Sequence, residues 1–245
     1  KRPGVRRRGR GGMQFRAATT YKLKPAKYPS FSLDEERRGD IIDLVHESGR
    51  DVPLAKVRFE NGSVSFIPAP LGTKVGQRMN FGLNSEIIDG NVISIQNIPD
   101  GTIVCNVEQQ FGDGGALMKS AGADATIFSH ADDGVILKLA SGKFKKLNPK
   151  NRAMIGTLAG GGVEDRPLMR AGVKMMRYKS KGHKYPIVRG VAQAAYVHPH
   201  GGGRHQHVGQ SSTVSRNAPP GAKVGSIAAR KTGRARIKER KQSIK

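Results

Sequence analysis

The 245-residue chain carries 43 Lys and Arg against 19 Asp and Glu, a formal charge of +24. A compact state with this charge repels itself unless a polyanion is bound, so the composition favours a nucleic-acid partner. A single cysteine excludes an internal disulfide, and without an apolar run of about 18 residues or a signal-peptide pattern we expect an intracellular, cytoplasmic protein with no membrane partner.

The charge is concentrated at the two ends. Residues 1–40 hold 12 basic and 4 acidic side chains, residues 41–140 hold 7 and 12, and residues 141–245 hold 24 and 3. Long blocks of one sign are typical of tails that bind nucleic acid. We therefore predict a basic N-terminal extension over 1–36 and a basic C-terminal helix and extension over 163–245. Within them, the stretch KRPGVRRRGRGGMQFR and residues 189–245 are rich in Gly, Pro, Ser, Lys and Arg, and we expect these two stretches to be disordered when free and extended when bound.

The middle of the chain reads as short β-strands. From Asp40 to about Gly160, apolar or alternating runs are interrupted about every ten residues by turn dipeptides, as in barrels and sandwiches. VRFENGSVSFI, which begins at Val57, predicts a hairpin with a two-residue Asn-Gly turn and positive φ at both turn positions. DGVILKLASGKFKKL predicts a second hairpin, turning at Ser-Gly. About 120 residues of short strands exceed one small barrel, so we divide the middle into 37–97 and 98–162.

One helix is predicted within EDRPLMRAGVKMMRYKSKG. Asp165 would cap its N-terminus, and Pro167 suits the first turn. The apolar stripe would consist of Leu168, Met169, Met175 and Met176. The opposite face would carry Arg170, Lys174, Arg177 and Lys181. A solvated basic face is one interpretation, and we favour a helix packed on the second barrel with this face on phosphates, because no acidic residue is available to pair with these cations.

Motifs for enzymatic chemistry are missing. The sequence contains neither G-x-x-x-x-G-K-[ST] nor G-x-G-x-x-G, and it has no G-x-S-x-G elbow. Cys105 lies in the strand-like run GTIVCNV, where a buried, inert cysteine is the common interpretation. Adjacent carboxylates such as Asp132 and Asp133 are typical of solvated turns. We therefore predict no catalytic residue and no enzyme.

A histidine cluster, HPHGGGRHQHVG, occupies residues 198–209. Its four imidazoles suggest zinc, but structural zinc sites usually include thiolate, and no Asp or Glu lies between Asp165 and Glu239. Val197 likewise supplies no carboxylate to orient His198 as a base. We favour RNA contact, in which the glycines let the backbone approach a phosphate while His rings and Arg204 stack on bases. A metal-dependent hydrolase and a basic nucleic-acid-compacting protein remain the alternatives.

Two adjoining segments carry a family resemblance. VRGVAQAAYVHPHGGGRHQHVG, followed by STVSRNAPPGAKVGSIAARKTGR, resembles the signature of the family of universal large-subunit ribosomal protein two. FRAATTYK, FIPAPLGTKVGQ, IPDGTIVCNVE, GGALMKSAGADATI and RAMIGTLAGG agree in the same order, so the resemblance covers essentially the whole chain. RHQH and KVGSIAARKTGR are similar to the archaeal and eukaryotic branch, and we favour the archaeal one. The family usually has Asp at the position of Val197 and Met-Asn at Gln193 and Ala194, so this sequence departs from the family pattern at these three positions.

The resemblance implies a fold and a role. Residues 37–97 would be an oligonucleotide-binding (OB) fold and residues 98–162 an SH3-like barrel, in a mainly β protein with one basic helix and long arms. The partners would be large-subunit ribosomal RNA and other large-subunit proteins, close to the peptidyl transferase centre. Contact with the small subunit at the interface is compatible with this role, and no homo-oligomer is expected. Magnesium shared with RNA phosphates is equally compatible, but no carboxylate cluster marks a dedicated metal or cofactor site.

We predict RNA contacts along both arms and the helix. The residues are Arg6, Arg7, Arg8, Arg10, Arg16, Lys174, Arg177, Lys181, Lys184, Arg189, His198, His200, Gly201, Gly202, Gly203, Arg204, His205, His207, Arg216, Lys223, Arg230, Lys231, Arg234 and Arg236.

Overall fold

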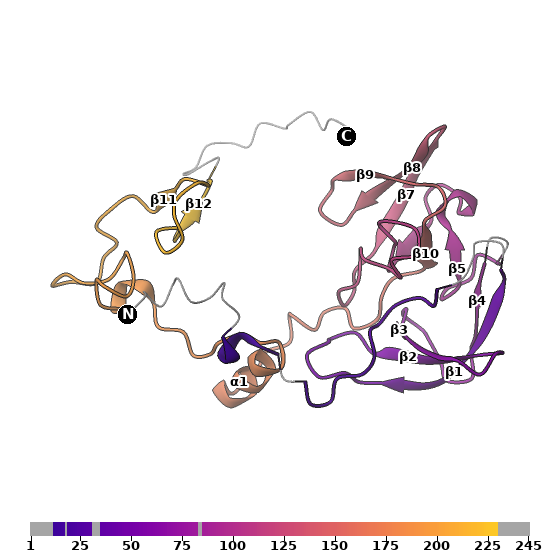
Figure 1. Cartoon of the computed structure of the whole chain (residues 1–245), viewed down its shortest axis with the longest axis horizontal. Coiled ribbons are helices and arrows are strands. Elements are labelled where there is room, and N and C mark those ends of the chain that lie inside the picture. Colours follow the sequence, from indigo (N-terminus) through magenta and orange to yellow (C-terminus); the bar gives the residue numbers. More distant parts are fainter. Residues whose placement is uncertain (1–11, 18, 31–34, 83–84, 230–245) are drawn as a thin grey trace. The chain divides into compact units, whose positions relative to one another are not determined.

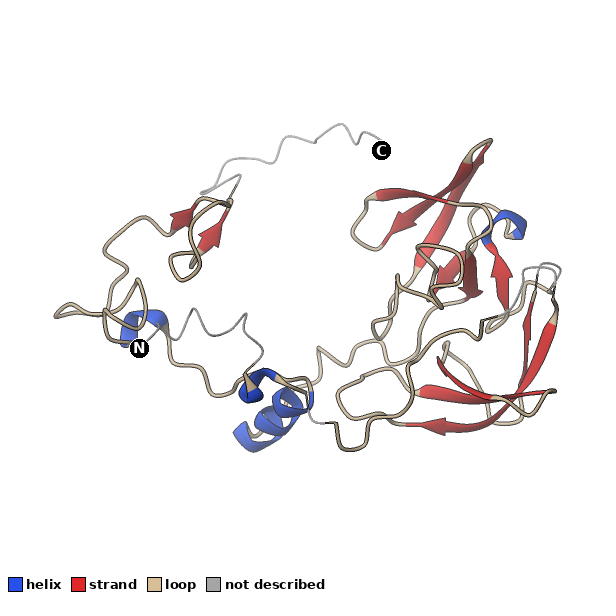
Figure 2. Ribbon diagram, viewed as in Figure 1, coloured by secondary structure: helices blue, strands red, loops and turns tan. Residues whose placement is uncertain are grey.

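The computed structural model describes residues 12–17, 19–30, 35–82 and 85–229. Within them, residues 20–167 form one compact unit, here called the body. Residues 168–229, here called the extension, form the other unit together with residues 12–17 and 19. Figure 2 shows that the body is built mainly of strands, whereas the extension consists mostly of loops with short helical segments and a short strand pair.

The body contains one ten-stranded sheet in the order β3-β2-β1-β4-β5-β10-β6-β7-β8-β9. The first five strands are β1 (Arg37–Val45), β2 (Leu54–Phe59), β3 (Val64–Pro68), β4 (Arg78–Phe81) and β5 (Val92–Ser94). The other five are β6 (Ile103–Cys105), β7 (Ala125–Ala131), β8 (Gly134–Leu139), β9 (Phe144–Leu147) and β10 (Arg152–Ile155). All pairings are antiparallel except β4 with β5. The mainly β prediction is therefore confirmed.

Two hydrophobic cores share the central strands of this sheet: the first includes side chains of β1 to β4, and the second includes side chains of β7 to β9. β5 lies between β4 and β10 in the sheet order (Figure 1). Met154 of β10 packs in the first core, while its neighbours Ala153 and Ile155 pack in the second. Val92 and Ile93 of β5 divide in the same way. Since successive side chains of a strand point to opposite faces, one strand can complete both cores. The boundary between 97 and 98 stays a prediction.

Both predicted hairpins form, but their turns differ from the prediction. In the β2–β3 hairpin the Gly62 amide donates to Phe59 O at 2.9 Å, and the Phe59 amide donates to Ser63 O at 2.9 Å. Only Gly62 has positive φ, at 77°. This pattern is a type I turn followed by a glycine bulge, which adds one residue to the two-residue turn. The Asn61 side chain favours it by accepting from the Ser63 amide at 3.0 Å.

The β8–β9 hairpin repeats this geometry. The Gly142 amide donates to Leu139 O at 2.8 Å, the Leu139 amide donates to Lys143 O at 2.9 Å, and Gly142 has a φ of 74°. Val135 and Leu137 of β8 are buried, as their alternation predicts.

The predicted helix forms only in its second half. α1 spans Ala171–Ser180 and begins after Arg170, which makes no side-chain cap. Met169 has a φ of 53°, and a left-handed residue cannot continue into a right-handed helix. Asp165 therefore lies in a preceding turn, where its amide donates to Gly162 O at 3.1 Å, and the predicted cap is wrong.

The predicted apolar stripe is also wrong in part. Leu168 and Met169 lie outside α1, and no residue of α1 is buried. Met175 and Met176 are 43% and 62% exposed. Packing of the helix on the second barrel stays a prediction.

Short elements complete the described residues. They are the 3-10 helices η2 (Met13–Phe15), η3 (Ile95–Asn97) and η4 (Gly190–Ala192), and the strands β11 (Thr213–Val214) and β12 (Ser226–Ile227). β11 and β12 pair in parallel.

Candidate nucleic-acid interface

The extension combines high positive charge with the lack of a hydrophobic core. Residues 168–229 contain ten Lys and Arg and no Asp or Glu. Gly182 is the only buried residue among them. Neither hydrophobic burial nor pairing with acids of its own can therefore hold this segment together, and backbone hydrogen bonds, glycines and aromatic contacts supply its local order.

α1 ends in a glycine cap that also contacts the N-terminal segment. The Gly182 amide donates to Lys179 O at 3.1 Å, and the His183 amide donates to Tyr178 O at 2.8 Å, the pattern of a Schellman motif. Gly182 has a φ of 71°, and a Cβ built on it would lie 2.7 Å from Phe15 O. This close approach places the backbone of Arg16, a predicted RNA contact, beside the helix end.

Aromatic rings position the predicted contact residue Lys174. Its Nζ lies 5.8 Å from the ring centroid of Tyr178 and 5.4 Å from that of Tyr185. A cation at this distance is attracted by the ring face. Arg177 and Lys181 are half-buried and Lys184 is exposed. The exposed Arg189 donates from its Nη2 to Gln206 Oε1 at 2.9 Å, which joins the start of η4 to the histidine segment.

The histidine segment folds back on the chain that precedes it. The Val197 and His198 amides donate to Ala194 O at 2.9 and 3.1 Å, and the Gly202 amide donates to Gln193 O at 3.0 Å. The Gln210 side chain donates to Pro199 O at 3.3 Å. Residues 193–202 therefore form a compact double turn.

The glycines of this turn allow close packing within the turn itself, whereas the sequence pattern predicted that they allow close approach of RNA. A Cβ on Gly201 would lie 2.4 Å from Gln193 O and 2.5 Å from Ala194 O, so the chain itself occupies that space. Gly202 has a φ of 82° and faces the Ala195 side chain at 2.9 Å. Gly203, also with a φ of 82°, is exposed and has no atom closer than 3.6 Å to its built Cβ. Of the three glycines, Gly203 leaves the most room for close approach by a ligand.

The four clustered histidines divide into two pairs. The His198 and His200 rings meet edge to face with centroids 5.1 Å apart, and His198 Nδ1 accepts from the His200 amide at 3.0 Å. His205 and His207 are exposed, and His207 Nδ1 lies 2.8 Å from His205 O. Within the described ranges, no three His, Cys, Asp or Glu side chains converge in a way that could hold a metal ion. The metal-dependent hydrolase alternative has no support in this arrangement.

The remaining predicted contacts fall into two groups. Arg204 is exposed in the histidine segment, and Arg216 and Lys223 are exposed in the loop between β11 and β12. A Cβ on Gly225, before β12, would lie 2.5 Å from Ser212 O, which explains why glycine stands there. The others lie outside the described residues: Arg6, Arg7, Arg8, Arg10, Arg230, Lys231, Arg234 and Arg236.

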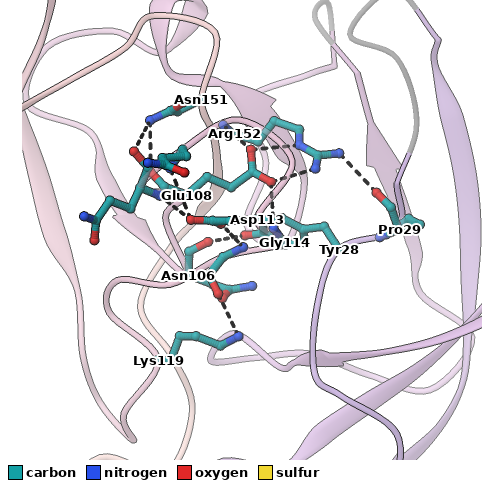
Figure 3. Close-up of polar contacts among 12 residues, drawn as sticks. Tyr28, Pro29, Asn106, Glu108, Asp113, Gly114, Lys119, Asn151 and Arg152 are labelled. Atoms are coloured by element: carbon teal, nitrogen blue, oxygen red, sulfur yellow. Dashed lines mark hydrogen bonds and ion pairs between the residues drawn. The ribbon is translucent and has the colours of Figure 1, made fainter.

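A buried ion pair that the sequence analysis did not identify fixes the segment leading to the N-terminal arm. Arg152 of β10 donates to Glu108 through Nη2 at 2.6 Å and Nε at 3.1 Å, and the two side chains are 4% and 0% exposed. Figure 3 shows the other side of this guanidinium reaching Pro29 O, at 3.3 Å. The Tyr28 hydroxyl donates to Asn106 O at 2.6 Å. Residues 28–29 are therefore attached to the body by charged and hydrogen-bonding side chains.

Further polar contacts complete this network. Glu108 Oε1 accepts from the Gly114 amide at 3.0 Å, and Lys119 Nζ donates to Ala26 O at 2.6 Å. Burial raises the pKa of Tyr28 well above its ordinary value and lowers the pKa of Lys119. Glu108, the charged residue at the end of the apolar run IVCNVE, was a sequence signal for a buried ion pair. Its partner Arg152 lies 44 residues away, so the sequence did not identify it.

Cys105 has no features of a nucleophile. Its side chain is buried in the first core, and burial raises the pKa of the thiol to about 12. Since the reactive form is the thiolate, Cys105 is inert at neutral pH, as the sequence predicts. Among the described residues, no helix is both long and apolar enough to cross a membrane.

Comparisons with known proteins agree over nearly the whole chain. The family model described as Ribosomal Proteins L2, C-terminal domain, matches residues 88–224. "Large ribosomal subunit protein uL2" of Cenarchaeum symbiosum (strain A) is 76% identical over 241 residues, covering 98% of this chain and 99% of that relative. The proteins of the same name from Korarchaeum cryptofilum (strain OPF8) and Sulfolobus acidocaldarius are 47% and 45% identical, over 96% and 93% of this chain and 96% and 95% of those relatives.

Proposed function

Because the chain belongs to the uL2 family of large-subunit ribosomal proteins, in its archaeal branch, we propose that it is a structural component of the large ribosomal subunit that binds ribosomal RNA in the ribosome. One observation carries the RNA-binding part of this proposal. The extension has ten cations, no acid and no hydrophobic core. A phosphate-rich partner would neutralise its positive charge and supply the stabilising contacts that the extension itself lacks.

The two units have different roles in this proposal. The body supplies a stable platform, and its Glu108–Arg152 pair fixes where the N-terminal segment leaves it. The extension and the N-terminal arm neutralise phosphates, and such contacts set position and register without reading sequence. We further propose that residues 37–97 and 98–162 act as OB-fold and SH3-like modules, and that other large-subunit proteins are partners.

The histidine turn supports RNA architecture near the peptidyl transferase centre. His198 Nδ1 accepts the His200 amide at 3.0 Å, so this nitrogen carries no proton. Val197 precedes His198, and no carboxylate lies in the extension to orient the ring as a base. His198 therefore holds the turn in shape, while the exposed Arg204, His205 and His207 are available to phosphates and bases.

Salt-dependent RNA binding tests the proposal. Affinity for a large-subunit RNA fragment, measured by fluorescence anisotropy, should fall about 10³-fold or more between about 50 and 200 mM salt, because many counterions are released. Arg216→Gln combined with Lys223→Gln should reduce the slope of log K against log salt by about 2, at about one per lost phosphate contact.

A matched control removes the same charge from the body. Lys74 and Lys150 are exposed there, and Lys74→Gln with Lys150→Gln should leave the slope unchanged. A flat salt response, or an equal loss of slope in both double variants, would contradict binding through the extension. Crosslinking within purified ribosomes then identifies the RNA segment that Arg204 and His198 contact.

A further inference from the structure

The solvent-facing side of β7, β8 and β9 carries an aromatic pair, the exposed Phe128 and the half-buried Phe144. Ile127 and Leu137 point into the second core, whereas Lys138 lies opposite Thr126 on one side and Phe144 on the other, facing away from it. The register of β7 against β8 shifts between Ile127 and Ser129, so Phe128 is an additional residue in a bulge. Bulges re-aim side chains.

The bulge places the Phe128 side chain outside the second core. Its side chain is 53% exposed, and its ring meets that of Phe144 edge to face, with centroids 4.8 Å apart and an interplanar angle of 61°. Phe111 is the other exposed phenylalanine among the described residues of the body, but the Arg152 guanidinium lies 5.4 Å from its ring centroid. The Phe128–Phe144 pair thus offers an aromatic surface that no cation of the described residues covers.

One exposed lysine lies beside this pair on the same face. Lys138 is directly opposite Phe144 in the register of β8 with β9. No ion pair found among the described residues involves Lys138, whereas Lys146, two residues after Phe144, pairs with Asp133. An aromatic surface beside an unpaired cation has the chemistry of a single-stranded nucleic-acid site, where bases stack on rings and cations bind the backbone.

We propose that Phe128 and Phe144 form a stacking site for an unpaired RNA base, and that Lys138 binds a neighbouring phosphate. This proposal rests on the proposed RNA-binding function and adds a contact on the body that the extension does not supply. It also gives a function to an aromatic ring that lies in solvent at a bulge. Replacing Phe128 with Ala should weaken this local contact about 5- to 150-fold, the range of one base–aromatic stack.

The chain contains no tryptophan, so Phe128→Trp creates a single fluorescent reporter at the site. Single-stranded oligoadenylate and a large-subunit RNA fragment should both quench its emission, because a stacked base contacts the indole. Leu71→Trp is the matched control, since Leu71 is 68% exposed on the body and away from Lys138 in sequence. Its emission should not change. Heparin, a polyanion without bases, should bind either variant without quenching. Adding Lys138→Gln to Phe128→Trp should raise the oligonucleotide concentration needed for half-quenching.

Anisotropy of labelled RNA, recorded in the same titrations, separates the possible failures. Unchanged Phe128→Trp emission while anisotropy reports binding would overturn the stacking site and leave the proposed function intact. Equal quenching of both tryptophan variants would also overturn the site. Loss of RNA binding by the unsubstituted chain would overturn the proposed function. Quenching in assembled subunits but not with RNA alone would show that a protein covers this surface, which likewise overturns the proposal.

Discussion

The body and the extension obtain their order in different ways. Every buried hydrophobic side chain among the described residues lies between Ala26 and Leu158, within the body. The extension buries only Gly182 and depends on turns, glycine contacts and the Lys174–Tyr178–Tyr185 cluster. The body should therefore fold alone, whereas the extension should take a single structure only on its RNA. Each prediction below tests one side of this comparison.

The largest effect is expected at the buried ion pair. Glu108→Gln keeps the shape of the side chain but leaves the Arg152 charge buried without a counter-ion, which should lower the free energy of unfolding by about 3–5 kcal/mol. Asp40→Asn is the control, because Asp40 pairs with Arg78 at the surface, with side chains 50% and 64% exposed. It should cost no more than about 1 kcal/mol. Urea unfolding measures both, and equal losses would show that burial does not decide the effect.

The next largest effect is expected from shortening a hydrophobic side chain, which should destabilise the body much more than the extension. Leu137 is fully buried in the second core, so Leu137→Ala should cost about 2–5 kcal/mol of unfolding free energy. Met176 of α1 is 62% exposed, and Met176→Ala should change that free energy by no more than about 0.5 kcal/mol. A large loss for Met176→Ala would show that the extension takes part in a core after all.

Local patterns in the sequence predicted the body better than its connections. The alternation of apolar residues located both hairpins. The Asn61–Gly62 dipeptide predicted positive φ at both residues, but only Gly62 has it, and the turn is one residue longer than predicted. The sharing of β5 and β10 between two cores leaves no periodic signal, because a strand buried on both faces reads as a continuous apolar run. The pairing of Glu108 with Arg152 depends on the sheet order and not on sequence spacing.

In the extension, composition indicated a nucleic-acid partner but not the shape. The RNA contacts that charge and the histidine turn indicate stay predictions. The left-handed Met169 delays the helix in a way that no local pattern shows. Gly201 was expected to face RNA, yet its space is occupied by Gln193 O and Ala194 O. A glycine in a sequence shows that a close approach is tolerated, but not which group makes the approach.

A single methyl group should perturb the extension at its helix end. Gly182→Ala places a Cβ at positive φ against Phe15 O, at a cost of about 1–2 kcal/mol. Affinity for large-subunit RNA should fall about 5- to 30-fold as a result. Gly172→Ala, in α1, meets no atom within 4 Å of the added Cβ and favours the helix, so it should not weaken binding. RNA affinity measured by anisotropy distinguishes the two, and equal affinities would contradict a role for this cap.

The smallest effect on a core residue of the body is expected between pH 8 and 10. Burial raises the pKa of Cys105 from its ordinary value of 9.0 to about 12. The protonated thiol therefore makes its full contribution to the free energy of unfolding below about pH 9. This contribution decreases by about 1.4 kcal/mol per pH unit as the pH rises toward 12. Burial raises the pKa of Tyr28 as well, which adds to the decrease. Urea unfolding between pH 8 and 10 should show a shallower decrease for Cys105→Ala, and an identical slope would place the thiol outside the core.

Amide hydrogen exchange of the full chain, free and bound to large-subunit RNA, tests the division between body and extension most directly. Peptides from β1 to β10 should be protected in both states, since they open only with the core. Peptides from residues 168–229 should exchange rapidly in the free chain and slow down strongly when RNA is bound. Protection of residues 168–229 in the free chain equal to that of the body would contradict the conclusion that the extension owes its order to RNA.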